Sequence, residues 1–209
     1  MSVSITTMRV ELTLLDEMLG TNPGNKKIHE DFIASKAPDA ETREDEIKRL
    51  SVSEVEEKEK TIFYKDKDGK PMIPTYHIKG FFKDTCGALR RSSGTESAKV
   101  KAYKKLIDGN IFIYTDINDA SGRYITVCMP AGGKIGDCQR SLRAQTMQGD
   151  RVALANSETV PKGSKLTFII CMTDKAYKPL IKEWLDYGRL RGLGQWRNSG
   201  KGAFTWKEV

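Results

Sequence analysis

The sequence predicts an α+β fold in which two helices pack on one face of an antiparallel sheet, the ferredoxin-like (RRM-like) arrangement. Apolar and polar residues alternate over 8–14, which is the period of a half-buried strand. Apolar residues recur with the helical period of 3.6 at about 76–91 and again at 177–185. Residues 166–172 form a dense apolar run, which is typical of a central strand.

The first half of the chain supplies the first strand, an insertion, a short second strand and two helices. The turn-forming residues 20–24 follow the first strand, and the charged stretch 26–60 reads as helices separated by Pro38. We therefore expect a single domain over 1–209 that carries residues 20–60 as a charged helical insertion. The next expected elements are a short strand at 62–64, a turn at 66–70, and helices at about 76–91 and 97–107.

The second half begins with strands, continues with the second main helix and ends with a strand. Strands are expected at 111–114, 124–129, 166–172 and 203–206, with a hairpin excursion at 140–158 and a helix from Thr173 or Asp174 to Gly188. Without the insertion and the hairpin, the order is strand, helix, strand, strand, helix, strand. This order is that of the ferredoxin-like fold.

The hairpin offers one packing face and one free face if its turn is centred on Gly149. Leu142, Ala144, Val152 and Leu154 then share the packing face. Arg143, Gln145 and Arg151 share the free face, where the two arginines could contact a ligand or serve as ordinary surface cations.

Residues 188–202 carry the strongest functional signal of the chain. Five glycines, four cations and Trp196 occur among these residues. Glycine lets the backbone approach a ligand, cations bind phosphate, and an indole stacks on a base. The alternative is a solvated loop, but the amphipathic helix before it and the alternating strand after it hold it at both ends. The composition indicates nucleic-acid binding.

Basic residues elsewhere extend this candidate surface. Lys79, Lys83, Arg90 and Arg91 recur on the first helix, although Arg90 and Arg91 could simply solvate its end, and Tyr76 is a second candidate for base stacking. The RNA-binding candidates are Lys79, Lys83, Arg90, Arg143, Arg151, Arg189, Arg191, Gly192, Gly194, Trp196, Arg197 and Lys201.

The net charge of +7 is unevenly distributed along the chain. Residues 39–60 contain nine acidic and five basic residues, a net charge of −4, which leaves +11 for the remainder. A basic body favours a polyanionic partner. The acidic stretch is either a solvated helix or a contact with a protein partner or another copy.

Composition also excludes several classes of protein. The sequence has no apolar run of the roughly 20 residues that a membrane span needs and no secretory signal, so we expect a cytoplasmic protein without a membrane partner. Four cysteines without a C-x-x-C pair, together with two histidines, do not make a zinc site, so no metal or cofactor is expected.

Three stretches, in the same order and with similar spacing, resemble the RAMP superfamily of CRISPR-associated proteins. Residues 69–80 resemble the family's Gly-x-Pro-x-Ile-Pro-Gly-Ser-Ser-x-Lys-Gly motif, and residues 158–166 resemble its Val-Pro-x-Gly-x-x-Phe motif. The glycine-rich loop before the last strand is the third. The resemblance covers most of the chain and is greatest to the backbone subunits that coat guide RNA in type III and related effectors.

The resemblance implies single-stranded, guide-like RNA as the partner, within a CRISPR effector complex or an assembly of copies stacked head to tail. It also implies a phosphate contact where the first helix begins, at residues 75–79, near the glycine-rich loop. This chain has Thr75, Tyr76 and His77 where the family has Gly-Ser-Ser. Family members that cleave RNA need an aspartate after the first strand, and no residue of 16–24 matches it convincingly, so we expect binding without catalysis.

Two other functions remain open from the sequence. A metal-dependent endoribonuclease could use Asp16, Glu17, Glu30 or Asp31 as ligands, although adjacent carboxylates on a strand or helix diverge, and His77 could serve in a metal-free ribonuclease. A phage-encoded anti-CRISPR protein could mimic or displace an effector backbone subunit, or sequester guide RNA, as a form of anti-defence.

Overall fold

The computed structural model describes residues 5–23, 60–116, 122–146 and 149–209, with the side chains of 142–153 excepted. Most of the predicted insertion at 20–60 lies outside these ranges, as do Glu30, Asp31 and all of the acidic stretch 39–60 except Lys60. Among the described residues no helix is long and apolar enough to cross a membrane.

The larger sheet is antiparallel throughout its described pairs. Its strands are β1 (Thr6–Leu14), β5 (Tyr64–Lys65), β6 (Pro71–Pro74), β7 (Ile111–Tyr114), β8 (Tyr124–Cys128), β11 (Lys165–Met172) and β12 (Phe204–Glu208). The order is β12–β1–β11–β8–β6–β5, and β7 pairs with the part of β11 that β8 leaves open. The predicted α+β class with an antiparallel sheet is confirmed, and the order is compatible with a ferredoxin-like fold.

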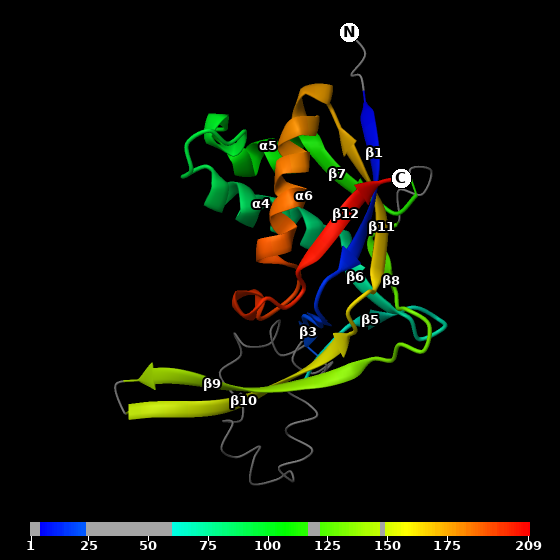
Figure 1. The fold of residues 1–209 in the computed structure, drawn as a ribbon, viewed down its shortest axis with the longest axis vertical. Helices are drawn as coiled ribbons and strands as arrows, with labels where there is room; N and C mark the ends of the chain where they lie inside the picture. Colours follow the sequence, from blue (N-terminus) through cyan, green and yellow to red (C-terminus); the bar gives the residue numbers. More distant parts are fainter. Residues whose placement is uncertain (1–4, 24–59, 117–121, 147–148) are drawn as a thin grey trace, which may run out of the picture.

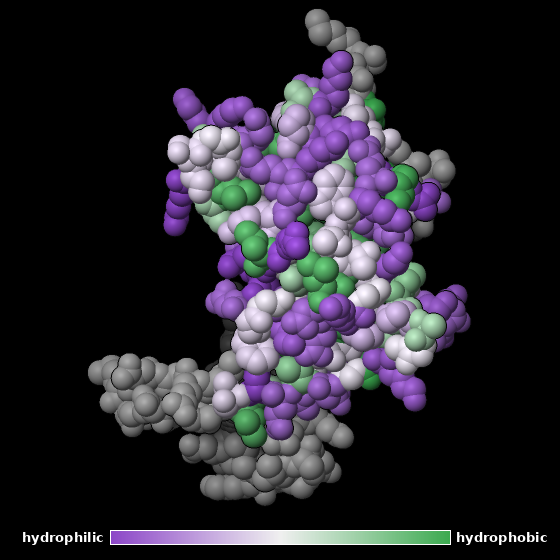
Figure 2. All heavy atoms as spheres, in the orientation of Figure 1, coloured by the Kyte–Doolittle hydropathy of each residue, from purple (hydrophilic) through white to green (hydrophobic). Residues whose placement is uncertain are grey.

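Three α-helices lie together on one side of this sheet (Figure 1). They are α4 (Thr75–Leu89), α5 (Tyr103–Asn110) and α6 (Lys178–Arg191). The short 3-10 helix η1 (Ser97–Lys99) precedes α5, η2 (Lys175–Tyr177) precedes α6, and η3 (Arg197–Ser199) follows α6. Figure 2 shows mostly hydrophilic side chains over this side of the molecule, with scattered hydrophobic ones.

The core lies between the sheet and the helices. The inward residues of β1, Met8, Val10, Leu12 and Leu14, are at most 1% exposed, as the alternation predicts. Phe82 of α4 and Trp184 of α6 are fully buried, with ring centroids 5.3 Å apart. Burial of each large apolar side chain contributes about 1.5–3 kcal/mol, so this packing fixes how the two helices lie on the sheet.

Helix α6, the second of the two main helices predicted to pack on the sheet, is longer than the sequence predicts. α6 continues to Arg191, and Gly188 lies inside it, where a Cβ would collide with the Phe204 ring of β12. The glycine therefore permits helix–strand contact and does not end the helix. Arg189 and Arg191 consequently belong to the last helical turn, and the loop begins at Gly192.

The region predicted as one helix at 97–107 is instead two elements, η1 and α5. Asp174 caps η2 by accepting a hydrogen bond from the Ala176 amide at 2.8 Å, so the expected cap precedes a 3-10 turn and not α6 itself.

The smaller sheet contains the hairpin. Its strands are β2 (Met18–Leu19), β3 (Asn22–Pro23), β4 (Thr61–Ile62), β9 (Gly136–Thr146) and β10 (Gly149–Val160), and β9 and β10 extend away from the body (Figure 1). β10 pairs with β2 and with β4, so the base of the hairpin adjoins the segment after β1.

The predicted hairpin register is wrong by three residues. Arg143 pairs with Val152, and Arg151 pairs with Ala144, because the innermost pair is Thr146 with Gly149. With a two-residue turn, each odd-numbered residue of one strand pairs with an even-numbered residue of the other. With a turn centred on one residue, odd-numbered residues pair with odd-numbered ones and even-numbered with even-numbered. Arg143 and Arg151 therefore belong to opposite faces of the backbone ladder, contrary to the expectation.

Candidate nucleic-acid interface

The glycine-rich loop is closed at its neck by backbone hydrogen bonds. The Leu193 amide donates to the Gly202 carbonyl at 2.9 Å, and Gly202 donates to the Glu17 carbonyl at 2.8 Å. Leu193 is 3% exposed and packs into the core. The loop is therefore anchored on the turn after β1 and is not a free tail.

Three glycines of this loop face the protein's own backbone. Gly192, Gly194 and Gly202 have φ between +71° and +80°. A Cβ at Gly192 would lie 2.6 Å from the Lys201 carbonyl oxygen, one at Gly194 would lie 2.7 Å from that of Leu19, and one at Gly202 would collide with that of Leu193. Close internal packing by itself requires glycine at these three positions, and contact between this backbone and a ligand stays a prediction.

Two of the expected phosphate-binding cations converge on one carboxylate of α4. Arg191 Nε and Arg197 Nη1 donate to Asp84 Oδ2 at 2.7 and 2.8 Å, and Arg191 Nη2 donates to Oδ1 at 3.3 Å. The hydrogen bond from Arg191 and the charges of both arginines hold the pKa of Asp84 below its usual range. The two guanidinium groups therefore connect the end of α6 and the loop to α4, and they already have a partner within the protein.

Lys201 makes the equivalent connection to the turn after β1. Its Nζ lies 2.8 Å from Glu17 Oε1 and 3.4 Å from Asp16 Oδ1, and the hydrogen bond to Glu17 raises its pKa. Because β1 ends at Leu14, the two adjacent carboxylates do not diverge as they would on a strand.

Trp196 is the one described non-glycine residue with a positive φ, at +54°. Its side chain is 42% exposed, and the Arg140 guanidinium carbon lies 5.6 Å from the ring centroid. Arg140, at the base of the hairpin, also donates to Gln195 Oε1 at 2.7 Å and to Ser157 Oγ at 3.0 Å. A left-handed backbone costs a non-glycine residue about 1–2 kcal/mol, so the surrounding contacts hold an unfavourable conformation that presents this indole.

The remaining candidates do not gather at the loop. Lys79 Nζ lies 5.0 Å from the Phe112 ring centroid and 3.3 Å from the Asp108 carbonyl oxygen. Lys83 pairs with the Asp108 carboxylate at 2.6 Å, and Arg90 lies over the Tyr103 ring at 5.3 Å. These three face α5 and β7. Arg189 is exposed on the last turn of α6, without an ion pair in the described part of the chain.

The start of α4 has neighbours other than the loop. The Thr75 amide donates to the Arg123 carbonyl at 2.8 Å, and an open pocket of about 200 Å³ there is lined by Tyr76, Lys79 and Phe112 among others. The loop meets α4 at Asp84 instead. His77 is partly buried, which lowers its pKa, and its ring contacts Tyr76 edge to face.

Sequence reasoning missed Asp84 and Arg140 as members of this site. Asp84 is the only carboxylate of α4, and a single acid on a helix rich in cations is a usable signal for a structural ion pair. Arg140 offered no comparable signal, because its contacts with Gln195 and Trp196 depend on how the hairpin leaves the body. Among the described residues no group of three or more His, Cys, Asp or Glu could hold a metal ion.

Asp84 gives a test of how the loop is held. Replacing Asp84 by alanine leaves two guanidinium groups without their acceptor and should lower the free energy of unfolding by about 2 kcal/mol. Asp108→Ala, which breaks the exposed pair with Lys83, is the matched control and should cost less than about 1 kcal/mol. Chemical denaturation at pH 7 measures both, and equal losses would contradict the anchoring role.

The same pair gives a pH dependence. A carboxyl whose pKa is depressed by folding stabilises the protein above its unfolded pKa, which is about 3.9, and this contribution is lost as the pH falls through the folded pKa. The stability difference between the parent and Asp84→Ala should therefore be full at pH 6 and decline below about pH 4.

Two solved structures that are similar to this chain are a type III-B Cmr-beta complex and Cmr6. A chain from the cryo-electron microscopy structure of type III-B Cmr-beta bound to cognate target RNA matches with a TM-score of 0.49 and 13% identity, over 97% of this chain and 59% of that chain. The crystal structure of Cmr6 from Pyrococcus furiosus matches with a TM-score of 0.48 and 11% identity, over 98% of this chain and 99% of that chain. This chain spans about three fifths of the length of the Cmr-beta chain. No protein-family model and no curated protein matches the sequence.

Proposed function

We propose that this protein binds single-stranded, guide-like RNA without cleaving it, on a surface formed by the glycine-rich loop, the last turn of α6 and the base of the hairpin. The observation that carries the proposal is Trp196, an exposed indole held in a left-handed conformation and braced by Arg140. Strained residues concentrate at functional sites, and an aromatic ring beside an arginine suits stacking of a base and contact with its phosphate.

Charge at this surface comes from fewer cations than composition suggests. Arg191 and Arg197 both pair with Asp84, and Lys201 pairs with Glu17 and Asp16, so these three cations support the loop. Within the described part of the chain Arg140 contacts the neutral side chains of Ser157, Gln195 and Trp196, and Arg189 is exposed. We assign these two arginines the phosphate contacts.

We also propose a particular core architecture for this chain. The order β12–β1–β11–β7 with antiparallel pairs, and α4 and α6 in the connections, supports an RRM-like core of RAMP type. Such a subunit would act within an effector complex or as an assembly of copies along RNA. A protein that displaces an effector subunit would use the same surface, and its RNA affinity would be the same.

Binding of RNA and its dependence on salt test the proposal. Anisotropy of a labelled mixed-sequence single strand, titrated with protein at several salt concentrations, should give an affinity that falls steeply with salt. Arg189→Ala should weaken binding and reduce the slope by about one, because one phosphate contact is lost. Lys182→Ala, on the same helix two turns away, should leave the slope unchanged.

The non-catalytic part is tested on the same RNA. Incubation with magnesium or manganese, and in parallel with EDTA, should leave the strand intact, as gel analysis would show. Metal-dependent products that disappear in Asp16→Asn would identify an endoribonuclease instead. Equal binding of single-stranded and duplex RNA would also contradict the proposal.

A further inference from the structure

An open groove of about 540 Å³ lies at the end of the helical layer farthest along α6 from the glycine-rich loop. It is formed where η1, the start of α5 and η2 meet, and its lining includes Lys99, Val100, Lys101, Lys105, Leu106 and Tyr177. Because α6 has 14 residues, the groove and the loop are separated by about 20 Å. The groove is thus a second surface, independent of the proposed RNA site.

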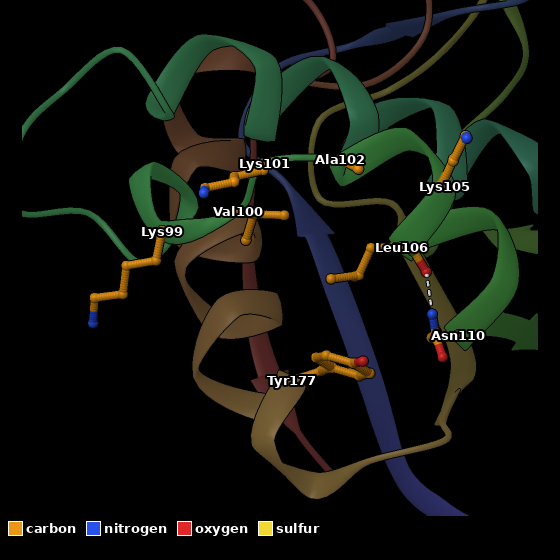
Figure 3. A pocket seen from close by; sticks show the side chains of 8 residues that line it. All are labelled: Lys99, Val100, Lys101, Ala102, Lys105, Leu106, Asn110 and Tyr177. Atoms are coloured by element: carbon orange, nitrogen blue, oxygen red, sulfur yellow. Dashed lines mark hydrogen bonds between the residues drawn. The ribbon is translucent and has the colours of Figure 1, made fainter.

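The floor of the groove is apolar and preformed. Figure 3 shows Val100 and Leu106 approaching one another above the Tyr177 ring, and all three side chains pack partly on the core. Glu183 of α6 holds η1 by accepting hydrogen bonds from the Glu96 and Ser97 amides at 2.6 and 3.0 Å. A ligand would therefore meet a fixed apolar surface.

The rim carries excess positive charge. Residues 90–105 contain six basic residues and one acidic residue, Glu96, which pairs with Lys99 at 2.7 Å. Lys101 and Lys105 have no ion pair within the described residues. Among the nearby acids, Asp108 pairs with Lys83 and Asp174 caps η2. Figure 3 shows the lysine side chains extending away from the apolar floor, where they could meet carboxylates.

The polar groups of the lining favour a peptide over a nucleic acid. The side-chain amide of Asn110 already has partners within the protein, because it donates to the Leu106 carbonyl at 3.1 Å and accepts from Thr173 Oγ1 at 2.8 Å. The cations of the lining are lysines, which act as point charges on flexible stems and do not provide the planar bidentate contacts that arginine makes to phosphate. The apolar floor and the lysine rim together suit an acidic peptide segment whose aliphatic side chains can pack on the floor.

We propose that this groove binds the acidic stretch 39–60 of a second copy of the chain. That stretch has nine acidic and five basic residues, and Ile47, Leu50, Val52 and Val55 are aliphatic anchors among them. Its charge is opposite to that of the groove, and its anchors match the floor. A groove that binds the segment of another copy makes a heterologous contact, which repeats from copy to copy.

A labelled synthetic peptide of residues 39–60, titrated with the full chain, tests the proposal by anisotropy. Lys101→Glu/Lys105→Glu should weaken peptide binding by roughly tenfold or more, because two attractive charges become repulsive. Lys67→Glu/Lys104→Glu is the control, since it makes the same change in net charge at exposed lysines outside the lining. A peptide with serine at the four aliphatic positions should also bind more weakly.

Light scattering completes the experiment. The mass of the parent and of the control should rise with concentration, whereas that of Lys101→Glu/Lys105→Glu should stay that of a monomer, with circular dichroism confirming that it is folded. Unchanged peptide binding and assembly in this variant would overturn the proposal. A groove variant that loses affinity for a single-stranded RNA while the peptide never binds would overturn it too, and would make the groove a nucleic-acid site.

Discussion

Replacing Trp196 by glycine should weaken binding of single-stranded RNA by roughly tenfold to a hundredfold, because stacking on one aromatic side chain contributes about 1–3 kcal/mol per base. The melting temperature should change little, since glycine adopts the φ of +54° without the cost that tryptophan bears. Loss of binding with retained stability would separate recognition from loop folding. Anisotropy and thermal unfolding measure the two effects.

Two further variants sharpen this test. Trp196→Phe keeps an aromatic face and should retain most of the affinity. Trp206 lies on β12, away from the loop, and its indole donates to Asp186 of α6 at 2.7 Å. Trp206→Phe should therefore change RNA affinity by less than about twofold. If Trp196→Gly binds RNA as tightly as the parent, the indole does not stack on a base and the proposed site is wrong.

Gly202→Ala should lower the stability of the protein more than any other glycine-to-alanine substitution in the loop. The residue combines a φ of +73° with a position where Cβ would collide with the Leu193 carbonyl oxygen, a backbone atom that cannot move without breaking the neck of the loop. We expect a loss of about 3 kcal/mol from strain and overpacking together, or roughly 10 °C in melting temperature.

Gly200 provides the matched control in the same loop. Its φ of +86° is also left-handed, but no atom lies within 4 Å of the position a Cβ would take. Gly200→Ala should therefore cost only about 1 kcal/mol. Thermal unfolding of the two variants compares them directly, and equal losses would show that backbone strain alone, without the collision, determines the effect.

The sequence by itself determined the main elements and the place of the candidate site. The alternation over 8–14 and the apolar stripe of α6 are local patterns that follow from which face each element buries, so β1 and α6 could be predicted from a few neighbouring residues. The glycine and cation content of 188–202 likewise marked the loop before β12. Element ends were less certain, because the contact of Gly188 with Phe204, which lets α6 continue, joins different elements.

Only the tertiary structure decided what the loop residues do. Asp84 and Arg191 are 107 positions apart, and their pairing depends on how α4 and α6 pack on the sheet. The same packing turns three glycines toward the protein's own backbone and brings Lys201 to Glu17. Composition counts every cation as available to a ligand, whereas the fold satisfies some of them with distant carboxylates, because charges half buried at an interface between elements are stabilised by partners within the protein.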